Sequence, residues 1–327
     1  MDRSIVTVGN FDGVHLGHRK LIDAARAMAQ RNGARVVAIT FDPAPAAVLN
    51  PGHEPPRIET IDRRVERLRE AGVNEVVVVH PDGDWLSREA EGFVQDVAQQ
   101  HAVAGWVEGP GFRFGRARRG DMTLLRAMGL RLGFEVQTVE PAIATLFDGS
   151  IRPASSSLAR WLLGRGRTAD AAAVLGRPFE MRGAVVRGDQ RGRTIGVPTA
   201  NLDPDRYAGA VVPRDGVYAG AARILDDLDD ADAPEAPEFC AAISVGVKPT
   251  FAGRALTIEA HLLGYAPDDP DALYGRSLSL RFGRFLRDAW RFPSAEALRA
   301  QLARDLADAR MLAGSSPMPS DSPGRMP

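Results

Sequence analysis

Apolar segments and amphipathic segments alternate along the first half of the chain. Near-continuous apolar runs indicate buried strands, and apolar residues repeated on one face at a period of about 3.6 indicate helices between them. The predicted strands are 4–9, 35–41, 73–80 and 104–107, and the predicted helices are 18–31, 61–71 and 88–100. This alternation predicts a parallel sheet with helices on both faces. Ligands of such sheets bind at the carboxyl ends of the strands.

The pattern changes near residue 180, where strands become short and alternate between polar and apolar residues. The predicted strands are 182–187, 216–224, 240–245, 257–263 and 277–282. Alternation and frequent turns predict an antiparallel barrel or sandwich. A helix with Ser294 as N-cap closes this domain, and its leucines at fourfold spacing lie on one face.

Two segments of biased composition limit the predicted domains. Residues 226–238 are acidic and rich in proline, which predicts a solvated loop between strands. Residues 313–327 are rich in proline, serine and glycine and predict a disordered tail. We therefore predict one domain over 1–179 and a second over 180–312.

Composition and charge exclude several classes of protein. Hydrophobic residues make up 44% of the chain and charged residues 25%, and 41 basic side chains balance 42 acidic ones. This balance lacks the basic surface that nucleic-acid binding requires. No apolar run is long enough to span a membrane or to serve as a signal peptide. Cys240 is the only cysteine, so no internal disulfide forms, and we predict a cytoplasmic protein.

The loop between the first strand and the first helix reads GNFDGVHLGH at residues 9–18. Its glycines let the backbone approach a ligand, and free N–H groups at a helix start attract anions. Two histidines three residues apart can donate hydrogen bonds to the oxygens of one phosphate group. A metal site or two surface histidines are the alternatives, although no third zinc ligand has a suitable spacing. The predicted phosphate-binding residues are Gly9, Asn10, Phe11, Gly13 and Gly17, and the predicted catalytic residues are His15 and His18.

A second anion site is predicted at the start of a later helix. Ser155, Ser156 and Ser157 open this helix, and Arg160 follows one turn further on. Hydroxyl groups at a helix N-terminus suit a phosphate, and a plain serine N-cap is the alternative.

Lysine is almost absent from the chain. Lys20 and Lys248 are the only lysines, and neither directly follows a glycine as the lysine of a Walker A loop does. Phosphate charge must therefore be offset by metal ions and backbone N–H groups.

Another glycine-rich motif, GAVVRGDQRGRTIGVPTANL, covers residues 183–202. The glycines suit a loop that lies over phosphates, and the oxygens of Thr199 and Asn201 suit Mg²⁺. A β-turn that ends in asparagine is the alternative. The predicted residues of the phosphate loop are Gly188, Gly192 and Gly196.

The predicted strand 257–263 has one polar face, which carries Thr257, Glu259 and His261. A kinase that transfers phosphate to an alcohol needs a base near the hydroxyl, and Glu259 is the candidate. A face that merely contacts solvent is the alternative, and His261 is assigned no role.

Together these motifs resemble the family of bacterial bifunctional riboflavin kinase/FMN adenylyltransferases. The resemblance implies an N-terminal Rossmann-like nucleotidyltransferase domain and a C-terminal antiparallel β-barrel closed by a helix. It implies that His15 and His18 bind ATP phosphates and stabilise the transition state, and that Glu259 is the catalytic glutamate. The same resemblance gives phosphate contacts to the serines and to Arg160. Further matching segments are FDPAP at 41–45, GFRFGRARRGD at 111–121, LGRPF at 175–179, GVYAG at 216–220 and VGVKPTF at 245–251.

The resemblance implies two reactions that both use ATP with Mg²⁺. Riboflavin is phosphorylated to FMN, and FMN is then adenylylated to FAD with release of pyrophosphate. Gly111 stands where the family commonly has Asp or Asn, and Ala44 stands where it has a polar residue. A riboflavin kinase with impaired or absent adenylyl transfer is therefore one alternative. A non-catalytic regulatory protein that binds flavin or nucleotide is the other.

Overall fold

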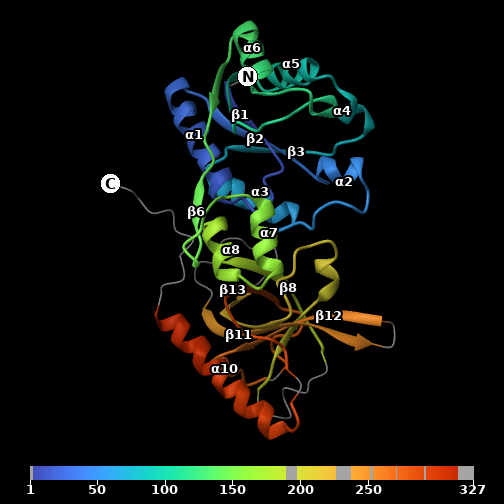
Figure 1. The fold of residues 1–327 in the computed structure, drawn as a ribbon, viewed down its shortest axis with the longest axis vertical. Coiled ribbons are helices and arrows are strands. Elements are labelled where there is room, and N and C mark those ends of the chain that lie inside the picture. The colour runs from blue at the N-terminus through green and yellow to red at the C-terminus, as the bar shows by residue number, and fades with distance from the viewer. Residues whose placement is uncertain are drawn as a thin grey trace. The chain divides into compact units, whose positions relative to one another are not determined.

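The computed structural model describes residues 3–188, 197–225, 237–250, 253–269, 271–290 and 292–315 (Figure 1). The chain forms two compact units. Residues 1–144 and 151–156 make up the first unit, and residues 145–150 and 157–327 make up the second.

The first unit is built on a five-stranded parallel sheet with the strand order β3-β2-β1-β4-β5. Its strands are β1 (Ser4–Val8), β2 (Arg35–Phe41), β3 (Glu75–Val79), β4 (Val103–Glu108) and β5 (Glu135–Thr138). Its helices are α1 (Leu16–Asn32), α2 (Pro45–Leu49), α3 (Ile61–Glu70), α4 (Gly83–Ser87), α5 (Ala90–Gln100), η1 (Arg116–Arg118) and α6 (Met122–Leu132). The predicted parallel α/β fold is confirmed, and α6 and β5 extend it beyond the predicted elements.

Helices cover both faces of this sheet because successive strand residues point to opposite sides. Val6 and Val8 belong to the apolar cluster that includes residues of α5 and α6. Ile5 belongs to the other cluster, which includes residues of α1. The two clusters explain why the strands are apolar on both faces.

The strand order places a topological switch point between β1 and β4. The chain moves from β1 to β2 and β3 on one side of the sheet, and it continues from β4 to β5 on the other. Crevices at the carboxyl ends of strands at such a point bind ligands in open α/β sheets. The loop that follows β1 is the GNFDGVHLGH motif.

The second unit contains a closed antiparallel barrel with the order β10-β11-β12-β9-β8-β13. Its strands are β8 (Phe179–Val186), β9 (Ala200–Leu202), β10 (Gly216–Leu225), β11 (Glu238–Thr250), β12 (Gly253–Leu262) and β13 (Ser277–Arg287). Its helical elements are α7 (Ser156–Gly164, whose first residue belongs to the first unit), α8 (Thr168–Leu175), η2 (Pro204–Tyr207) and α10 (Ala295–Ser315), and the short strands β6 (Ile143–Thr145) and β7 (Ile151–Pro153) form a separate pair. The barrel predicted from alternating polarity is confirmed, and β9 is a strand that the pattern did not predict.

Helix α10 packs against β10 and β11, as expected of a closing helix. Ser294 is its N-cap, since its Oγ accepts a hydrogen bond from the Ala297 N–H at 3.2 Å. A buried ion pair between Arg287 and Asp305, 2.6 Å apart, joins the helix to β13. The helix ends at Ser315, so its last turn overlaps the predicted tail.

Several predicted segments fall partly or wholly outside the described residues. These are Gly192, Gly196, residues 226–236 of the acidic loop and residues 316–327 of the tail. The compact units divide after Ser156, whereas the predicted domain boundary lies at residue 180. We keep residue 180 as the proposed start of the second functional domain because β8, the first barrel strand, begins at Phe179.

Candidate active sites

The loop from Gly9 to His18 is a tight structure held against β2. The Gly9 N–H donates to the Ile39 carbonyl at 3.0 Å, and Thr40 Oγ1 donates to the Asn10 carbonyl at 3.1 Å. Gly13 has a φ of 80°, which glycine adopts without strain. These contacts hold the loop at the carboxyl end of β1, where the sheet order places a ligand crevice.

His15 and His18 lie together at the start of α1. Their ring centroids are 3.6 Å apart and their planes differ by 23°, so the two imidazoles stack. His15 is the N-cap of α1, and its Nδ1 accepts from the Gly17 N–H at 3.1 Å. An Nδ1 that accepts leaves the ring proton of a neutral imidazole on Nε2, which is then a donor. The pair is therefore suited to donate hydrogen bonds to phosphate oxygens.

Gly17 is required beside this pair because a side chain would displace His15. A Cβ at position 17 would lie 2.9 Å from His15 Cε1. We expect Gly17→Ala to lower kcat/KM for the adenylyl transfer that the resemblance implies by about tenfold or more, because a small misplacement of a catalytic group is costly. A Cβ at Gly92 in α5 would meet nothing within 4 Å, so Gly92→Ala is the matched control. The assay measures FAD formed from FMN and MgATP, and equal rates for both variants would contradict this role.

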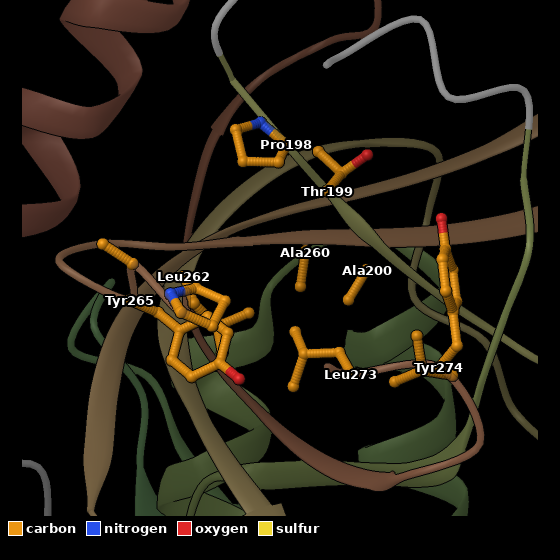
Figure 2. A pocket seen from close by; sticks show the side chains of 11 residues that line it. Pro198, Thr199, Ala200, Ala260, Leu262, Tyr265, Leu273 and Tyr274 are labelled. Carbon is orange, nitrogen blue, oxygen red and sulfur yellow. The ribbon is translucent and has the colours of Figure 1, made fainter. Parts of the chain in front are cut away.

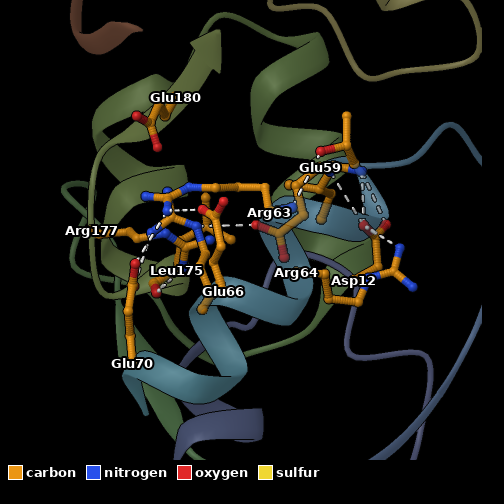
Figure 3. A network of polar contacts seen from close by, with 12 residues as sticks. Asp12, Glu59, Arg63, Arg64, Glu66, Glu70, Leu175, Arg177 and Glu180 are labelled. Atoms are coloured by element: carbon orange, nitrogen blue, oxygen red, sulfur yellow. Dashed lines mark hydrogen bonds and ion pairs between the residues drawn. The ribbon is translucent and has the colours of Figure 1, made fainter. Parts of the chain in front are cut away.

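Asp12, which the sequence analysis did not select, anchors the same loop from inside the protein (Figure 3). Its carboxylate oxygens accept from the Ile58 N–H at 3.0 Å, and Arg64 lies 3.6 Å from Oδ1. The carbonyl of Asp12 accepts from Ser156 Oγ at 2.7 Å. The one feature of the sequence that could have drawn attention to Asp12 is its place in the motif, between Gly9 and Gly13. The structure gives it an anchoring role that spacing alone does not reveal.

The other predicted residues of this site differ in their surroundings. Phe11 is buried in the core, and its ring packs edge-on against His18 with centroids 5.1 Å apart. Asn10 is exposed. Ser156 contacts the loop through Asp12, whereas Ser157 and Arg160 belong to the other compact unit. The roles of Ser155, Ser157 and Arg160 in phosphate binding stay predictions.

The second site is centred on Asn201 in β9. Asn201 pairs with Glu259 of β12 on one side and with Val186 of β8 on the other. Directly opposed residues of antiparallel strands share one face of the sheet. Thr199 Oγ1 donates to Glu259 Oε2 at 3.4 Å, a long hydrogen bond. The structure thus brings together the hydroxyl, amide and carboxylate that the sequence analysis selected.

Gly188 lies over Asn201 at the end of β8. A Cβ at position 188 would stand 2.6 Å from the side-chain amide of Asn201, so a side chain there would displace this amide. Gly192 and Gly196, the other predicted glycines of this loop, lie outside the described residues.

The strand alternation predicted for β12 is confirmed by burial. Ile258, Ala260 and Leu262 are buried, while Glu259 and His261 are half-buried. His261, to which the sequence analysis gave no role, has Nδ1 2.7 Å from the Pro198 carbonyl. Its imidazole, with the proton on Nδ1, holds the residue before Thr199. The polar face of β12 therefore positions the PTAN segment through His261 and Glu259.

The oxygen groups of this site fit a magnesium ion by their chemistry. Thr199 and Asn201 offer hydroxyl and amide oxygens, which are hard ligands of the kind that Mg²⁺ takes, and Glu259 lies beside them. Within the described residues, no group of three or more His, Cys, Asp and Glu side chains is arranged to hold a metal ion.

A pocket of about 430 Å³ opens beside Thr199 (Figure 2). Tyr265 and Tyr274 stand on opposite sides of it, and Ala260 and Leu262 line it from β12. The lining is mainly apolar, as in sites for planar organic rings. No pattern along the chain predicted this pocket, because its walls come from separate strands and loops.

Arg187 lies at the Tyr274 side of this pocket. Its guanidinium carbon is 4.8 Å from the centroid of the Tyr274 ring, and it pairs with Asp271 at 3.2 Å. It directly precedes Gly188, so a cation stands where the predicted phosphate loop begins.

Comparisons with known proteins cover both units. The family model for FAD synthetase matches residues 1–148, and the family model for riboflavin kinase matches residues 175–313. The bifunctional riboflavin kinase/FMN adenylyltransferase of Escherichia coli (strain K12) is 34% identical over 311 residues, which cover 95% of this chain and 93% of that protein. The protein of the same name from Pseudomonas fluorescens is 34% identical over 314 residues, covering 95% and 94%.

A solved structure has the same arrangement of elements along almost the whole chain. It is the crystal structure of a protein described as a macrolide-efflux protein from Streptococcus pneumoniae, with a TM-score of 0.81, 28% identity and 94% of each chain covered. In the part of the present chain that the structure describes, no helix is both long and apolar enough to cross a membrane. The two family models and the relatives that match along nearly their full length show that this chain belongs to the bifunctional riboflavin kinase/FMN adenylyltransferase family.

Proposed function

We propose that this chain phosphorylates riboflavin to FMN in its barrel unit and adenylylates FMN to FAD in its α/β unit. The observation that carries the proposal is the presence of two phosphate-handling constellations in one chain. One is the stacked His15–His18 pair at a helix start, and the other is the set of Thr199, Asn201 and Glu259. ATP is the co-substrate of both reactions.

In the adenylyl transfer, a phosphate oxygen of FMN attacks the α-phosphorus of ATP and pyrophosphate leaves. The nucleophile is already anionic, so positioning and charge stabilisation can suffice without a strong base. His15 and His18 donate hydrogen bonds to the phosphate oxygens as negative charge grows there. Asp12 holds their loop in place from the protein interior.

In the kinase reaction, the 5′-hydroxyl of riboflavin attacks the γ-phosphorus of ATP and ADP leaves. Glu259 accepts the hydroxyl proton. Thr199 and Asn201 would hold Mg²⁺, which offsets the phosphate charge when bound. Gly188 lets the loop come close to Asn201, and no Walker A lysine takes part.

The apolar pocket beside Thr199 suits the adenine ring of ATP. Ala260 and Leu262 line the pocket, whereas Glu259 projects from the opposite face of β12. The hydroxyl of riboflavin must approach Glu259. Thr199 lines the pocket and also contacts Glu259, so the phosphates of a nucleotide in the pocket can extend toward that hydroxyl. Tyr265 and Tyr274 would flank the adenine.

Product analysis with riboflavin and MgATP tests the function. We expect FMN to appear first and FAD with pyrophosphate to follow. FMN without FAD would favour the kinase-only alternative, in which Gly111 and Ala44 weaken adenylyl transfer. A Cβ at position 111 would meet no other atom within 4 Å, so the backbone there leaves room for the Asp or Asn side chain that the family commonly has. Flavin binding without turnover would overturn both catalytic assignments and favour a regulatory protein.

A cytoplasmic location fits these substrates and the single Cys240, and it stays a proposal.

A further inference from the structure

Glu108, the last residue of β4, has a buried carboxyl group that the reaction described above does not use. Its exposed fraction is 3%. Oε1 accepts two hydrogen bonds, from the Val8 N–H at 2.6 Å and from Trp106 Nε1 at 3.1 Å. The Glu108 carbonyl faces the other neighbouring strand, where it accepts from the Val139 N–H at 2.9 Å. The side chain and the main chain of this residue therefore serve opposite sides of β4.

The contact with Val8 lies at the switch point of the sheet. The backbone pairing of β1 with β4 ends at Val6 and Trp106. Beyond that pair, the Glu108 side chain supplies the acceptor for the Val8 N–H. Val8 is the last residue of β1, and Gly9 begins the loop that carries His15 and His18. A buried N–H left without an acceptor is costly, so Glu108 secures the end of β1 on the β4 side, while the Gly9 N–H bonds to Ile39 of β2 on the other side.

We propose that Glu108 is a positioning residue for adenylyl transfer, whose buried carboxyl binds the end of β1 and holds the His15–His18 loop in register with the sheet. The inference rests on the proposed adenylyltransferase function of this unit.

The surroundings of Glu108 favour its neutral form. Burial raises its pKa to about 8, and the hydrogen bonds from Val8 and Trp106 only partly oppose this. No charged side chain of the described residues, on β1, β4 or their neighbours, contributes to the shift. The group is therefore protonated near neutral pH and ionises as the pH rises through about 8. Ionisation would put a negative charge inside the protein next to Val8, the last residue before the His15–His18 loop.

The matched variants Glu108→Gln and Glu108→Ala separate charge from hydrogen bonding. Glutamine keeps an acceptor for Val8 and Trp106 and cannot ionise, whereas alanine removes the acceptor. We measure kcat and KM for FAD formation from FMN and MgATP between about pH 6.5 and 9.5. Each pH unit changes the ratio of protonated to ionised Glu108 tenfold, so this range covers both forms. Riboflavin phosphorylation by the same samples is the internal control.

The wild-type protein should lose about tenfold in kcat/KM for FAD formation between pH 7 and pH 9, as the neutral fraction falls. Glu108→Gln should stay within about twofold of its own value at pH 7, and Glu108→Ala should lose about tenfold at every pH. Riboflavin phosphorylation should be unchanged in both variants.

An alkaline fall that persists in Glu108→Gln would overturn the proposal. So would an alanine variant with wild-type kcat/KM, or one whose only defect is a lower unfolding temperature. If the alanine variant does not fold, the pH profile of the glutamine variant still decides. A wild-type protein that forms no FAD at any pH would instead reject the adenylyltransferase function, so the two failures are distinguishable.

Discussion

His18→Ala should lower the rate of FAD formation from FMN and MgATP by about 10²–10³-fold, the usual cost of removing one donor to a developing oxyanion. His18 stacks on His15 with centroids 3.6 Å apart and packs against the buried Phe11 ring. Removal of the imidazole takes away one of the two proposed phosphate donors and the ring against which His15 stacks. The loss should appear mainly in kcat, because the donor acts most strongly on charge that grows during the reaction.

The internal comparison is riboflavin phosphorylation by the same preparation, which should proceed at the wild-type rate. His53→Ala is the matched control, since His53 is an exposed histidine of the same unit. This control should form FAD at the wild-type rate. If His18→Ala lowered FMN formation and FAD formation equally, the assignment of the two reactions to separate sites would be wrong.

Glu259→Gln should lower riboflavin phosphorylation by about 10²–10⁴-fold, the range typical of a general base. Glutamine has nearly the shape of glutamate, and its oxygen can still accept from Thr199 Oγ1, which lies 3.4 Å from Glu259 Oε2. Ligand binding should therefore persist while the proton acceptor is lost. Titration with riboflavin and ATP, alongside single-turnover rates of FMN formation, separates binding from chemistry.

Glu296→Gln is the control for this experiment, because Glu296 is an exposed glutamate at the start of α10. It should retain riboflavin phosphorylation, and FAD formation from added FMN should be retained in both variants. Wild-type turnover in Glu259→Gln would remove Glu259 from its proposed role. Loss of riboflavin binding in step with turnover would point to a structural role for the carboxylate instead.

Local patterns in the sequence predicted most of the fold. The apolar segment 35–41 coincides with β2, and Asn32-Gly33 marks the end of α1, where Gly33 has a φ of 57°. These features depend on neighbouring residues, so composition and spacing are enough to find them. β9 was not predicted because a strand of three residues is too short for its alternation to be told from chance. It is a strand because β8 and β12 supply its hydrogen bonds.

The site residues that lie within one motif could be predicted from the sequence. The residues that hold these motifs in place could not. Asp12 contacts Ile58, which is 46 residues away, and Glu108 contacts Val8 across 100 residues. His261 reaches Pro198 across 63 residues. A single sequence does not indicate such pairs, because the two partners come into contact only when distant segments of the chain pack together.

The sequence by itself determined the two classes of domain, the histidine pair and the PTAN segment, because spacing along one helix or strand decides which neighbouring side chains share a face. Only the tertiary structure decided that the sheet parts between β1 and β4 and that Glu108 closes this point with a buried carboxyl. Only the closed barrel placed Thr199 and Glu259 together and formed the pocket beside them. Burial and long-range hydrogen bonds set the chemistry of these groups, and both arise only when distant segments pack.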